Sequence, residues 1–389
     1  MISVITVISI LGVAAGVMAL VIALAITTGF RTTLQKSLLS ISAHVNVLDK
    51  NGDGIENWRE MGDRFRKIPH VVGVAPVLSA GVYVIGGRQS KGMSLLGIDA
   101  RSERTVSETL HHLKEGSLDR LNSADKIPGM VVGYRLAQEI GLTLNRVVKV
   151  ISPQGTLTPS GILPKYFSFR VVGIFDSGFY DFDMNFAYAS LPVVQWALSL
   201  EDVVNTIEIR LDDPDMAPQV AKAAEALAGP KFGALTWIQQ NSQLFGALEM
   251  ERRVTVVTIG LIVLVAALNI LIALVMMVME KYRDIAVLIS LGAKRSQIRG
   301  IFMLQGILIG VVGTAIGLTF GYSICYLANR YHWMKLNEEV YALSYVPFSP
   351  SPWHGVWIAA AAILVSFLAT IYPARSATTI APAEVLRYE

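Results

Sequence analysis

The stretch from residue 49 to residue 60 carries oxygen-bearing side chains at the spacing of a calcium-binding loop. The matching residues are Asp49, Asn51, Asp53, Gly54 and Glu60. In an EF-hand, oxygens at these positions wrap Ca²⁺ and the glycine makes a sharp turn. The flanks argue against calcium, because the residues before the loop alternate like a strand and Glu56 stands where an aliphatic residue is usual. The competing interpretation is a strand-to-helix turn, bent at Gly52 and Gly54 and capped by Asp53.

Other arrangements that would carry chemistry are missing from the sequence. No G-x-x-x-x-G-K-[ST] segment is present, so the chain has no P-loop to hold ATP. There is no Ser/His/Asp nucleophile elbow either. His111 and His112 are adjacent, so on a helix they would point about 100° apart and could not chelate one ion. We therefore expect no catalytic residue, no metal site and no cofactor on this chain.

The composition indicates which elements must organise the molecule. Hydrophobic residues make up 53% of the 389 positions and charged residues only 16%, whereas a soluble domain has about a quarter charged residues. Four stretches contain no Asp, Glu, Lys, Arg or His: 1–30, 254–279, 300–329 and 355–374. Each can supply the roughly 20 apolar residues that a membrane-spanning helix needs. The sequence therefore predicts a helical membrane protein and excludes disorder and a purely soluble enzyme.

The first apolar stretch is a permanent span rather than a secretory signal. A signal peptide has a basic start and an apolar core of about 7–15 residues. Here no basic residue precedes Ser3, and the uncharged stretch is 30 residues long. The missing basic flank leads us to expect a truncated N-terminus or a misplaced start codon.

The distribution of charge predicts the orientation in the membrane. Residues 31–253 hold 24 basic and 24 acidic residues, so their net charge is zero. The whole net charge of +3 lies between residues 280 and 299. Short basic loops stay in the cytoplasm. We therefore expect both termini in the cytoplasm and residues 31–253 in the periplasm, and the charge indicates no nucleic-acid partner.

The large segment between the first two spans shows a mixed α/β pattern. Alternating runs predict strands at 44–48, 71–77, 81–85, 94–98, 147–152, 167–175, 185–189 and 206–210. Helical spacing is found at 56–68, 105–113, 134–140 and 217–228. The only cysteine, Cys325, lies in a predicted span. The α/β domain can therefore form no disulfide and must be held together by its own core.

The predicted spans carry packing residues rather than a solute pathway. Ion paths and proton relays need Asp, Glu or His within the membrane, and these spans have none. Asn269 and Gln305 are their most polar side chains, and an inter-helix hydrogen bond accounts for them. Glycines recur at spacings that let helices approach closely; they are Gly12, Gly16, Gly306, Gly310, Gly313, Gly317 and Gly321. We expect Gly12, Gly16 and Asn269 to serve helix packing or to face lipid.

A short amphipathic segment follows the second span. Residues 280–293 read EKYRDIAVLISLGA, which predicts a helix ended by Gly292. Ile285, Leu288 and Ile289 share one face, whereas Lys281, Arg283 and Asp284 are polar. Such a helix could lie on the lipid interface or dock into a groove of a partner.

This segment resembles the coupling helix of ABC-transporter permeases of the MacB/FtsX-like class. The resemblance implies a contact with an ATPase through Glu280, Lys281, Arg283, Asp284, Ile285, Leu288 and Gly292. The ending from Tyr372 to Arg387 is similar to that class as well, and so is the layout of one span, a large outer domain and three further spans.

Within that class, the whole chain resembles the lipoprotein-releasing (Lol) permeases of the LolC/LolE type. The first span, with Thr28-Gly29-Phe30 after it, is similar to theirs, as are Ile68-Pro69 and Gly97-Ile98-Asp99. Residues 155–164 resemble the hook that grips the periplasmic chaperone LolA. The implied contacts are Thr158, Pro159, Gly161, Ile162, Leu163 and Pro164. A plain Pro/Gly-rich hairpin is the alternative.

The resemblance implies a MacB-like permease with four transmembrane α-helices and a large mixed α/β periplasmic domain between helices 1 and 2. Its parts would be a first helix at 1–30, the periplasmic domain at 31–250 and an FtsX-like permease domain at 251–389. The later helices would lie near 254–279, 300–329 and 355–374, and the coupling helix near 280–292. The family's basic lead-in is missing, and Asn145-Arg146 stands where related domains often have Gly-Asp.

The function that this resemblance implies is the ATP-driven extraction of lipoproteins from the bacterial inner membrane. The chain would be no enzyme itself, because ATP and Mg²⁺ would bind a LolD-like ATPase subunit. Its other partners would be a second permease (LolE-like or another copy of itself), membrane lipid, triacylated lipoproteins and a LolA-like chaperone. The rival interpretations are a MacB-like export permease and an FtsX-like signalling permease that controls a cell-wall hydrolase.

Overall fold

The computed structural model describes residues 2–86, 89–111, 113–122, 126–158, 161–337, 343 and 345–376. The chain divides into two compact units. The helix unit comprises Met1–Thr33, Gly246–Lys335 and Tyr345–Glu389. The sheet unit comprises Leu34–Phe245 and Leu336–Ser344.

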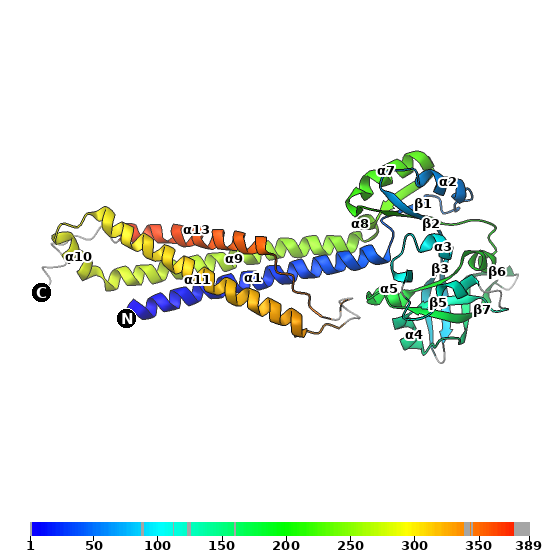
Figure 1. The fold of residues 1–389 in the computed structure, drawn as a ribbon, viewed down its shortest axis with the longest axis horizontal. Coiled ribbons are helices and arrows are strands. Elements are labelled where there is room, and N and C mark those ends of the chain that lie inside the picture. Colours follow the sequence, from blue (N-terminus) through cyan, green and yellow to red (C-terminus); the bar gives the residue numbers. More distant parts are fainter. Residues whose placement is uncertain are drawn as a thin grey trace. The chain divides into compact units, whose positions relative to one another are not determined.

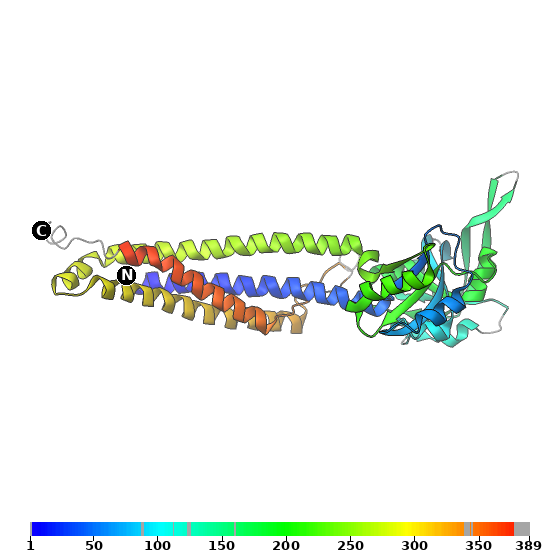
Figure 2. The ribbon, with the colours of Figure 1, turned by 90° about the horizontal axis from the view of Figure 1, so that it is seen from above.

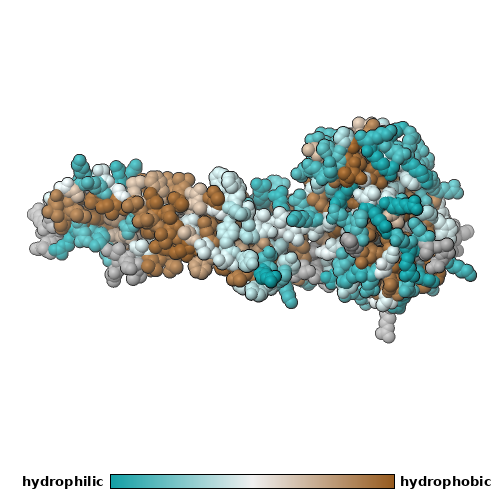
Figure 3. Space-filling view, viewed as in Figure 1, coloured by the Kyte–Doolittle hydropathy of each residue, from teal (hydrophilic) through white to brown (hydrophobic). Residues whose placement is uncertain are grey.

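Four long helices dominate the helix unit. They are α1 (Ile2–Ile41), α9 (Ser242–Glu280), α11 (Arg295–Tyr331) and α13 (Pro352–Ser376), with the short α10 (Tyr282–Ser290) between α9 and α11. Each of the four is long and apolar enough to cross a membrane, and apolar side chains cover much of the bundle's visible face (Figure 3). The four apolar helices predicted from the sequence are thus confirmed. Hydropathy identifies the part of a helix that suits lipid, but it does not show where the helix ends. Helices α1 and α9 therefore both extend beyond their uncharged stretches.

The sheet unit is built on ten strands. They are β1 (Val45–Asp49), β2 (Val71–Gly86), β3 (Gln89–Ile98), β4 (Glu115–Gly116), β5 (Gly129–Gly133), β6 (Val147–Thr158), β7 (Gly161–Phe175), β8 (Phe186–Ser190), β9 (Thr206–Leu211) and β10 (Phe232–Thr236). Their order is β10-β1-β9-β2-β3-β8-β5-β7-β4, and β6 pairs with both β2 and β7. Only the β3–β8 and β5–β7 pairs are parallel among the described strands. Figure 1 shows this sheet with its helices.

Short helices cover the sheet and close its core. They are α2 (Trp58–Phe65), α3 (Ala100–Glu103), α4 (Tyr134–Ile140), α5 (Tyr180–Asn185), α6 (Leu191–Leu198), α7 (Ala217–Ala228) and α8 (Trp237–Gln240), with 3-10 turns at Thr109–His111, Leu118–Asn122 and Pro214–Met216. Val45, Phe65, Met130 and Ile209 are among the fully buried side chains of the main core. Burial of such apolar side chains stabilises the unit by about 1.5–3 kcal/mol each.

Two local predictions fail for identifiable reasons. Separate strands were expected at 71–77 and 81–85, but β2 runs unbroken from Val71 to Gly86. Around Pro76 it pairs only with β9, and a strand with one bonded side tolerates the missing N–H. Where a helix was expected at 105–113, the described residues form only a 3-10 turn at Thr109–His111; the α-helix of this region, α3, lies earlier, where Asp99 caps it by accepting a hydrogen bond from the Ser102 N–H at 3.2 Å.

Candidate functional site

Helix α10 packs with one side against the bundle and leaves the other exposed. Ile285 is 3% exposed and lies in a cluster with Val278, Phe302 and Ala374, against which Ile289 also packs. Leu288 is 44% exposed and Leu291 79%. Of the three apolar residues predicted to share one face, Ile285 and Ile289 hold α10 in place, and Leu288 stays partly exposed beside the same groove as Ile285. The face that can meet a partner combines Leu288 with Leu291, a residue that the sequence analysis missed.

Polar residues predicted for this helix lie at its start and its end. Glu280 is the last residue of α9. Lys281 caps α10 and forms an ion pair with Asp284, while Arg283 is exposed in the first turn. Gly292 has a φ of +98°, and its N–H donates to the Ile289 carbonyl at 3.0 Å. That left-handed conformation stops the helix, as a glycine after a helix end does.

A groove of about 310 Å³ opens beside α10. Its walls come from α9, α10 and α11, and its lining residues include Lys281, Asp284, Leu288, Ile301 and Phe302. The groove is apolar at its base and carries one ion pair on its rim. It can receive a helix end or a loop that presents an apolar side chain.

Glycines on α11 let this helix pack closely against α1 and α13. A methyl group added to Gly313 or Gly317 would collide with Val13 or Val17 of α1, and one added to Gly321 would lie in tight contact with Val21. The same addition at Gly306 or Gly310 would collide with Thr370 or Ser366 of α13. The rising order of the first three pairs shows that α1 and α11 run parallel; the falling order of the other two shows that α13 runs antiparallel to α11. Backbone-level contact along two seams makes α1, α11 and α13 a firmly packed trio.

The contact between α1 and α9 is of a different kind. The space that a Gly12 side chain would occupy is filled by the Asn269 amide, and Gly16 lies in ordinary contact with Ala266. Next to this contact, a narrow apolar cleft is lined by α1, α9 and α13, including Val17, Ile262 and Ile358. Gly12, Gly16 and Asn269, the residues predicted for packing, thus all lie where α1 meets α9. The helix faces around this contact are uncharged.

Strands β6 and β7 form a long hairpin that stands out from the sheet unit (Figure 2). Pairing continues to Thr158 opposite Gly161, beyond the strand ends expected at Ser152 and Phe167. The register shifts between Ser152 and Thr156, opposite the exposed Pro164. Such irregularities accommodate a proline and bend a strand. Of the six predicted hook residues, Pro159 lies outside the described residues; Thr158, Gly161, Ile162 and Leu163 are described in their backbone as strand.

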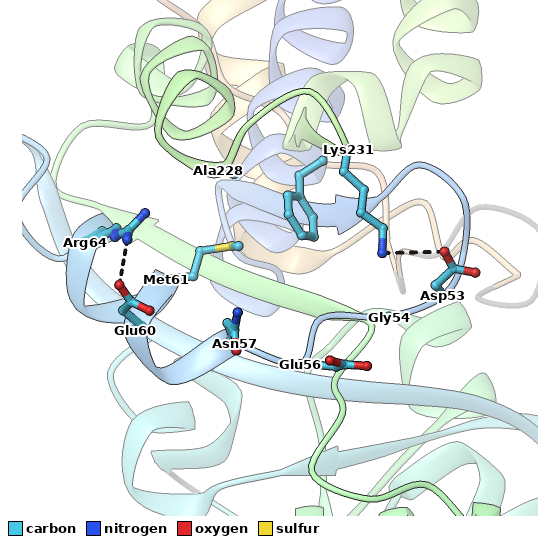
Figure 4. A pocket seen from close by; sticks show the side chains of 10 residues that line it. Asp53, Gly54, Glu56, Asn57, Glu60, Met61, Arg64, Ala228 and Lys231 are labelled. Carbon is cyan, nitrogen blue, oxygen red and sulfur yellow. Dashed lines mark hydrogen bonds and ion pairs between the residues drawn. The ribbon is translucent and has the colours of Figure 1, made fainter.

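The calcium-like segment is held by a lysine. Lys231 Nζ lies 3.2 Å from Asp49 Oδ2 and 3.5 Å from Asp53 Oδ2, and Glu60 pairs with Arg64 instead (Figure 4). The Asn51 backbone N–H and the Lys231 ammonium lower the pKa of Asp49. No group of three or more acidic, His or Cys side chains among the described residues could hold a metal ion.

The turn itself bends at Gly52 and Gly54, which have φ values of +81° and +91°, as expected. The predicted cap at Asp53 is wrong, because α2 begins later, with Asn57 at its cap position.

Comparisons with known proteins cover both units. Residues 6–227 match the family model of the MacB-like periplasmic core domain, and residues 256–382 match the FtsX-like permease C-terminal model. The lipoprotein-releasing system transmembrane protein LolC of Neisseria meningitidis serogroup B is 31% identical to this chain, over 100% of the chain and 95% of the relative. The LolC of Xylella fastidiosa is 32% identical at the same coverages, and the LolE of Haemophilus influenzae is 26% identical over 97% and 93%.

The chain belongs to the LolC/LolE family of lipoprotein-releasing transmembrane proteins. This confirms the family resemblance drawn from the sequence. The FtsX-like match of this LolC/LolE family member contains α10, α11 and α13, and its MacB-like match contains the β6–β7 hairpin. Among solved structures, the periplasmic region of MacB from Actinobacillus actinomycetemcomitans is similar with a TM-score of 0.36 and 15% identity, over 53% of this chain and 94% of that one.

Proposed function

We propose that this chain is a permease subunit of an ABC transporter that extracts lipoproteins from the inner membrane and hands them to a periplasmic chaperone. One observation carries the proposal: the match to lipoprotein-releasing relatives runs through the whole chain at 31–32% identity. A MacB-like exporter or an FtsX-like signalling permease would share the two family models, but not this full-length relationship.

The energy must come from outside this chain. Withdrawing an acyl chain from lipid costs about 0.8 kcal/mol for each methylene, so three chains together need an external source. The sequence has no P-loop, and we assign ATP and Mg²⁺ to a separate ATPase subunit. Its contact would be the exposed side of α10, where Leu288 and Leu291 meet an apolar part of the ATPase and the groove beside Leu288, with Lys281 and Asp284 in its lining, receives an apolar side chain of that partner.

The packing of the helix unit supports a path for the resulting motion. Ile285 ties α10 to Phe302 at the start of α11. The glycine seams then tie α11 to α1 and to α13. A push on α10 would therefore displace α1, α11 and α13 together, because backbones in direct contact cannot slide past one another without collision.

Lipoprotein acyl chains would lie against α1 and α9. Their uncharged faces suit hydrocarbon, and the contact at Gly16 is looser than the α1–α11 seam. Motion of α1 relative to α9 would squeeze the acyl chains outward. The protein part of the lipoprotein would then reach the chaperone held by the β6–β7 hairpin.

Aromatic side chains mark one boundary of the proposed membrane-spanning region. Exposed Tyr331, Trp333, Trp353 and Trp357 gather at the end of α11 and the start of α13, as expected at a membrane–water interface. The basic segment at the opposite end of α11 would be cytoplasmic. A cysteine replacing Ser168 should react with an impermeant maleimide in intact spheroplasts, and one replacing Ser296 only after lysis. The reverse pattern would contradict the orientation.

The decisive experiment is reconstitution of the chain with its ATPase in vesicles that contain a triacylated lipoprotein. Two preparations, one with a LolE-like partner and one with this permease alone, would identify the functional assembly. Transfer of the lipoprotein into a soluble complex with a LolA-type chaperone should require ATP and fail with a non-hydrolysable analogue. ATP hydrolysis without transfer in either preparation would contradict the proposal and favour export or hydrolase control.

A further inference from the structure

An arginine binds the last turn of α1 to the rest of the sheet unit. Arg210 lies on β9, and its side chain is 15% exposed. Its Nη1 donates hydrogen bonds to the carbonyl oxygens of Leu39 and Val106, each at 3.0 Å. Its Nη2 donates to Glu108 Oε1 at 2.5 Å. One guanidinium therefore joins a helix, a strand and a loop.

The Leu39 carbonyl needs such a partner. It belongs to the last four carbonyls of α1, which have no acceptor role within the helix. A cation at this end also interacts favourably with the helix dipole. A second bond supports the first, because the Glu108 N–H donates to the Ser40 carbonyl at 3.3 Å. The loop and the helix end are thus fastened at two successive residues.

The residues after α1 continue this junction. The His44 N–H donates to the Ile209 carbonyl at 3.0 Å, and the Leu211 N–H donates to His44 Nδ1 at 3.2 Å. Burial, and then the charge of Arg210, lower the pKa of His44 to about 4. The imidazole is therefore neutral at pH 7, and its Nδ1 lone pair stays free to accept. The His44 carbonyl also accepts from the Trp237 N–H at 3.0 Å, at the start of α8.

The start of α9 is held by uncharged contacts, which include the hydrogen bond from the Trp237 indole N–H to the Pro214 carbonyl at 3.3 Å. Trp237 meets Phe245 edge to face at 5.2 Å between ring centroids. Aromatic contacts permit small sliding, whereas a planar guanidinium with three fixed acceptors defines both distance and direction. A displacement of α1 would therefore reach the sheet more directly than a displacement of α9.

We propose that Arg210 is a positioning residue that fastens the end of α1 to the sheet unit, an inference that rests on the function proposed above. Movement of α1 during the ATP cycle then displaces the sheet unit and its β6–β7 hairpin. Arg210 touches neither ATP nor lipoprotein in this scheme. Loss of the Arg210 guanidinium should leave ATP hydrolysis unchanged but uncouple it from lipoprotein release.

The test compares Arg210→Gln with Arg59→Gln in the reconstituted complex. Arg59 lies in the same unit and is also held by an ion pair, with Asp202, which is on neither α1 nor β9. Arg210→Gln should lower the lipoprotein released per ATP on the order of tenfold, the scale of one lost charge-assisted hydrogen bond, with ATP hydrolysis unchanged. Arg59→Gln should match the parent.

A disulfide between the end of α1 and the loop at residue 108 tests whether a covalent link can replace Arg210. The chain has one native cysteine, the buried Cys325, so cysteines at positions 40 and 108 can be oxidised selectively. In the Arg210→Gln background, the oxidised pair should restore release per ATP and the reduced pair should not. If Arg210→Gln does not fold, Arg210→Lys replaces it; lysine keeps the charge but presents its donors on one nitrogen instead of the two that Arg210 uses, so partial uncoupling is expected.

Hydrogen exchange separates this inference from the proposed function. Loss of the guanidinium should speed amide exchange at residues 38–44 and 104–108 in the full chain, whether or not the complex releases lipoprotein. Unchanged exchange would refute the fastening itself. Faster exchange with unchanged release per ATP, or a failed rescue by the oxidised pair, would refute its role in coupling. Absence of release in the unsubstituted complex would instead count against the proposed function.

Discussion

Buried acids in the sheet unit show how single side chains set its response to pH. Asp183 is 1% exposed, and its Oδ1 accepts hydrogen bonds from the Ser177 N–H at 2.9 Å and the Ser177 hydroxyl at 2.6 Å. Burial is the main cause that raises its pKa to about 6, and the nearby Asp176 adds to it. Lys114 pairs with Asp176 at 2.9 Å and keeps that second carboxyl ionised. Below about pH 6 the site therefore holds one proton, on Asp183, while Asp176 stays ionised.

We predict that Asp183→Asn stabilises the protein at neutral pH. Because the folded pKa of Asp183 is raised, its contribution to stability is complete below about pH 4 and is lost as the pH rises through about 6. Asparagine resembles the protonated form, so the variant should gain up to about 3 kcal/mol over the parent at pH 7.5 and nothing near pH 4.

Unfolding of the full chain in detergent, followed by tryptophan fluorescence across pH 4–8, measures this difference. His44 acts in the opposite direction, since its lowered pKa makes the fold lose stability as the pH falls from 6.5 towards 4. It is present in both proteins, so its effect cancels in the comparison. Asp181→Asn, at an exposed position of the same helix, is the control. Equal stability of parent and Asp183→Asn at pH 7.5 would contradict the raised pKa of Asp183.

At the scale of elements, the sequence predicted what periodicity and hydropathy encode. The apolar runs located four helices, and the predicted bounds of α4 and α7 coincide with the observed ones. It could not predict that Ile285 faces the bundle while Leu291 is exposed, because an amphipathic helix does not reveal which neighbour covers it. It also missed Arg210, since no local pattern shows that a strand residue meets the end of a helix about 170 positions earlier.

The seam between α1 and α11 gives the first prediction about elements. Gly317→Ala should destabilise the helix unit, because the added methyl group would lie 2.6 Å from the Ala14 carbonyl oxygen and 2.7 Å from Val17 Cβ. Gly300→Ala is the matched control on the same helix, where nothing lies within 4 Å. There the change should be neutral or stabilising by up to about 1 kcal/mol, through helix propensity.

Thermal unfolding in detergent distinguishes the two glycine variants, which differ only in position along α11. A lower midpoint for Gly317→Ala and an unchanged or higher midpoint for Gly300→Ala are expected. If both rise together, the seam is loose enough to admit a methyl group, and the path of motion proposed through it loses its support.

Helix α10 gives the second prediction about elements. Leu288→Asp places a charge on the exposed apolar side and should abolish co-purification with the ATPase, or uncouple hydrolysis from release, at a cost of several kcal/mol at the contact. Ser290→Asp adds the same charge at another exposed position of α10 and should have little effect. Both variants should insert into the membrane as the parent does. Retained ATPase binding and release by Leu288→Asp would make α10 an interfacial anchor only.

At the scale of the whole molecule, two kinds of chemistry are kept apart along the sequence. The membrane helices have no acidic, basic or His side chain in their central stretches, so they provide packing and an apolar surface. The sheet unit contains the buried acid Asp183, most of the ion pairs of the described residues and the projecting hairpin. A protein that moves lipid-anchored cargo needs both, because acyl chains require an uncharged surface and a soluble chaperone requires a specific one.

The hairpin gives the prediction that tests the handover of cargo. Replacing Thr158–Pro164 with a Gly/Ser linker should abolish capture of a LolA-type chaperone by the full-length complex. Pro159 and Pro164 each fix one φ angle near −65°, so the parent segment loses less entropy on binding than the linker would. ATP hydrolysis should be unchanged, because residues 158–164 and α10 belong to different units of the chain. The same linker in place of residues 50–53, an exposed turn of the sheet unit, is the matched control. A pull-down with immobilised chaperone measures capture directly, and undiminished capture by the 158–164 variant would reject the hook and raise the odds of a function other than lipoprotein release.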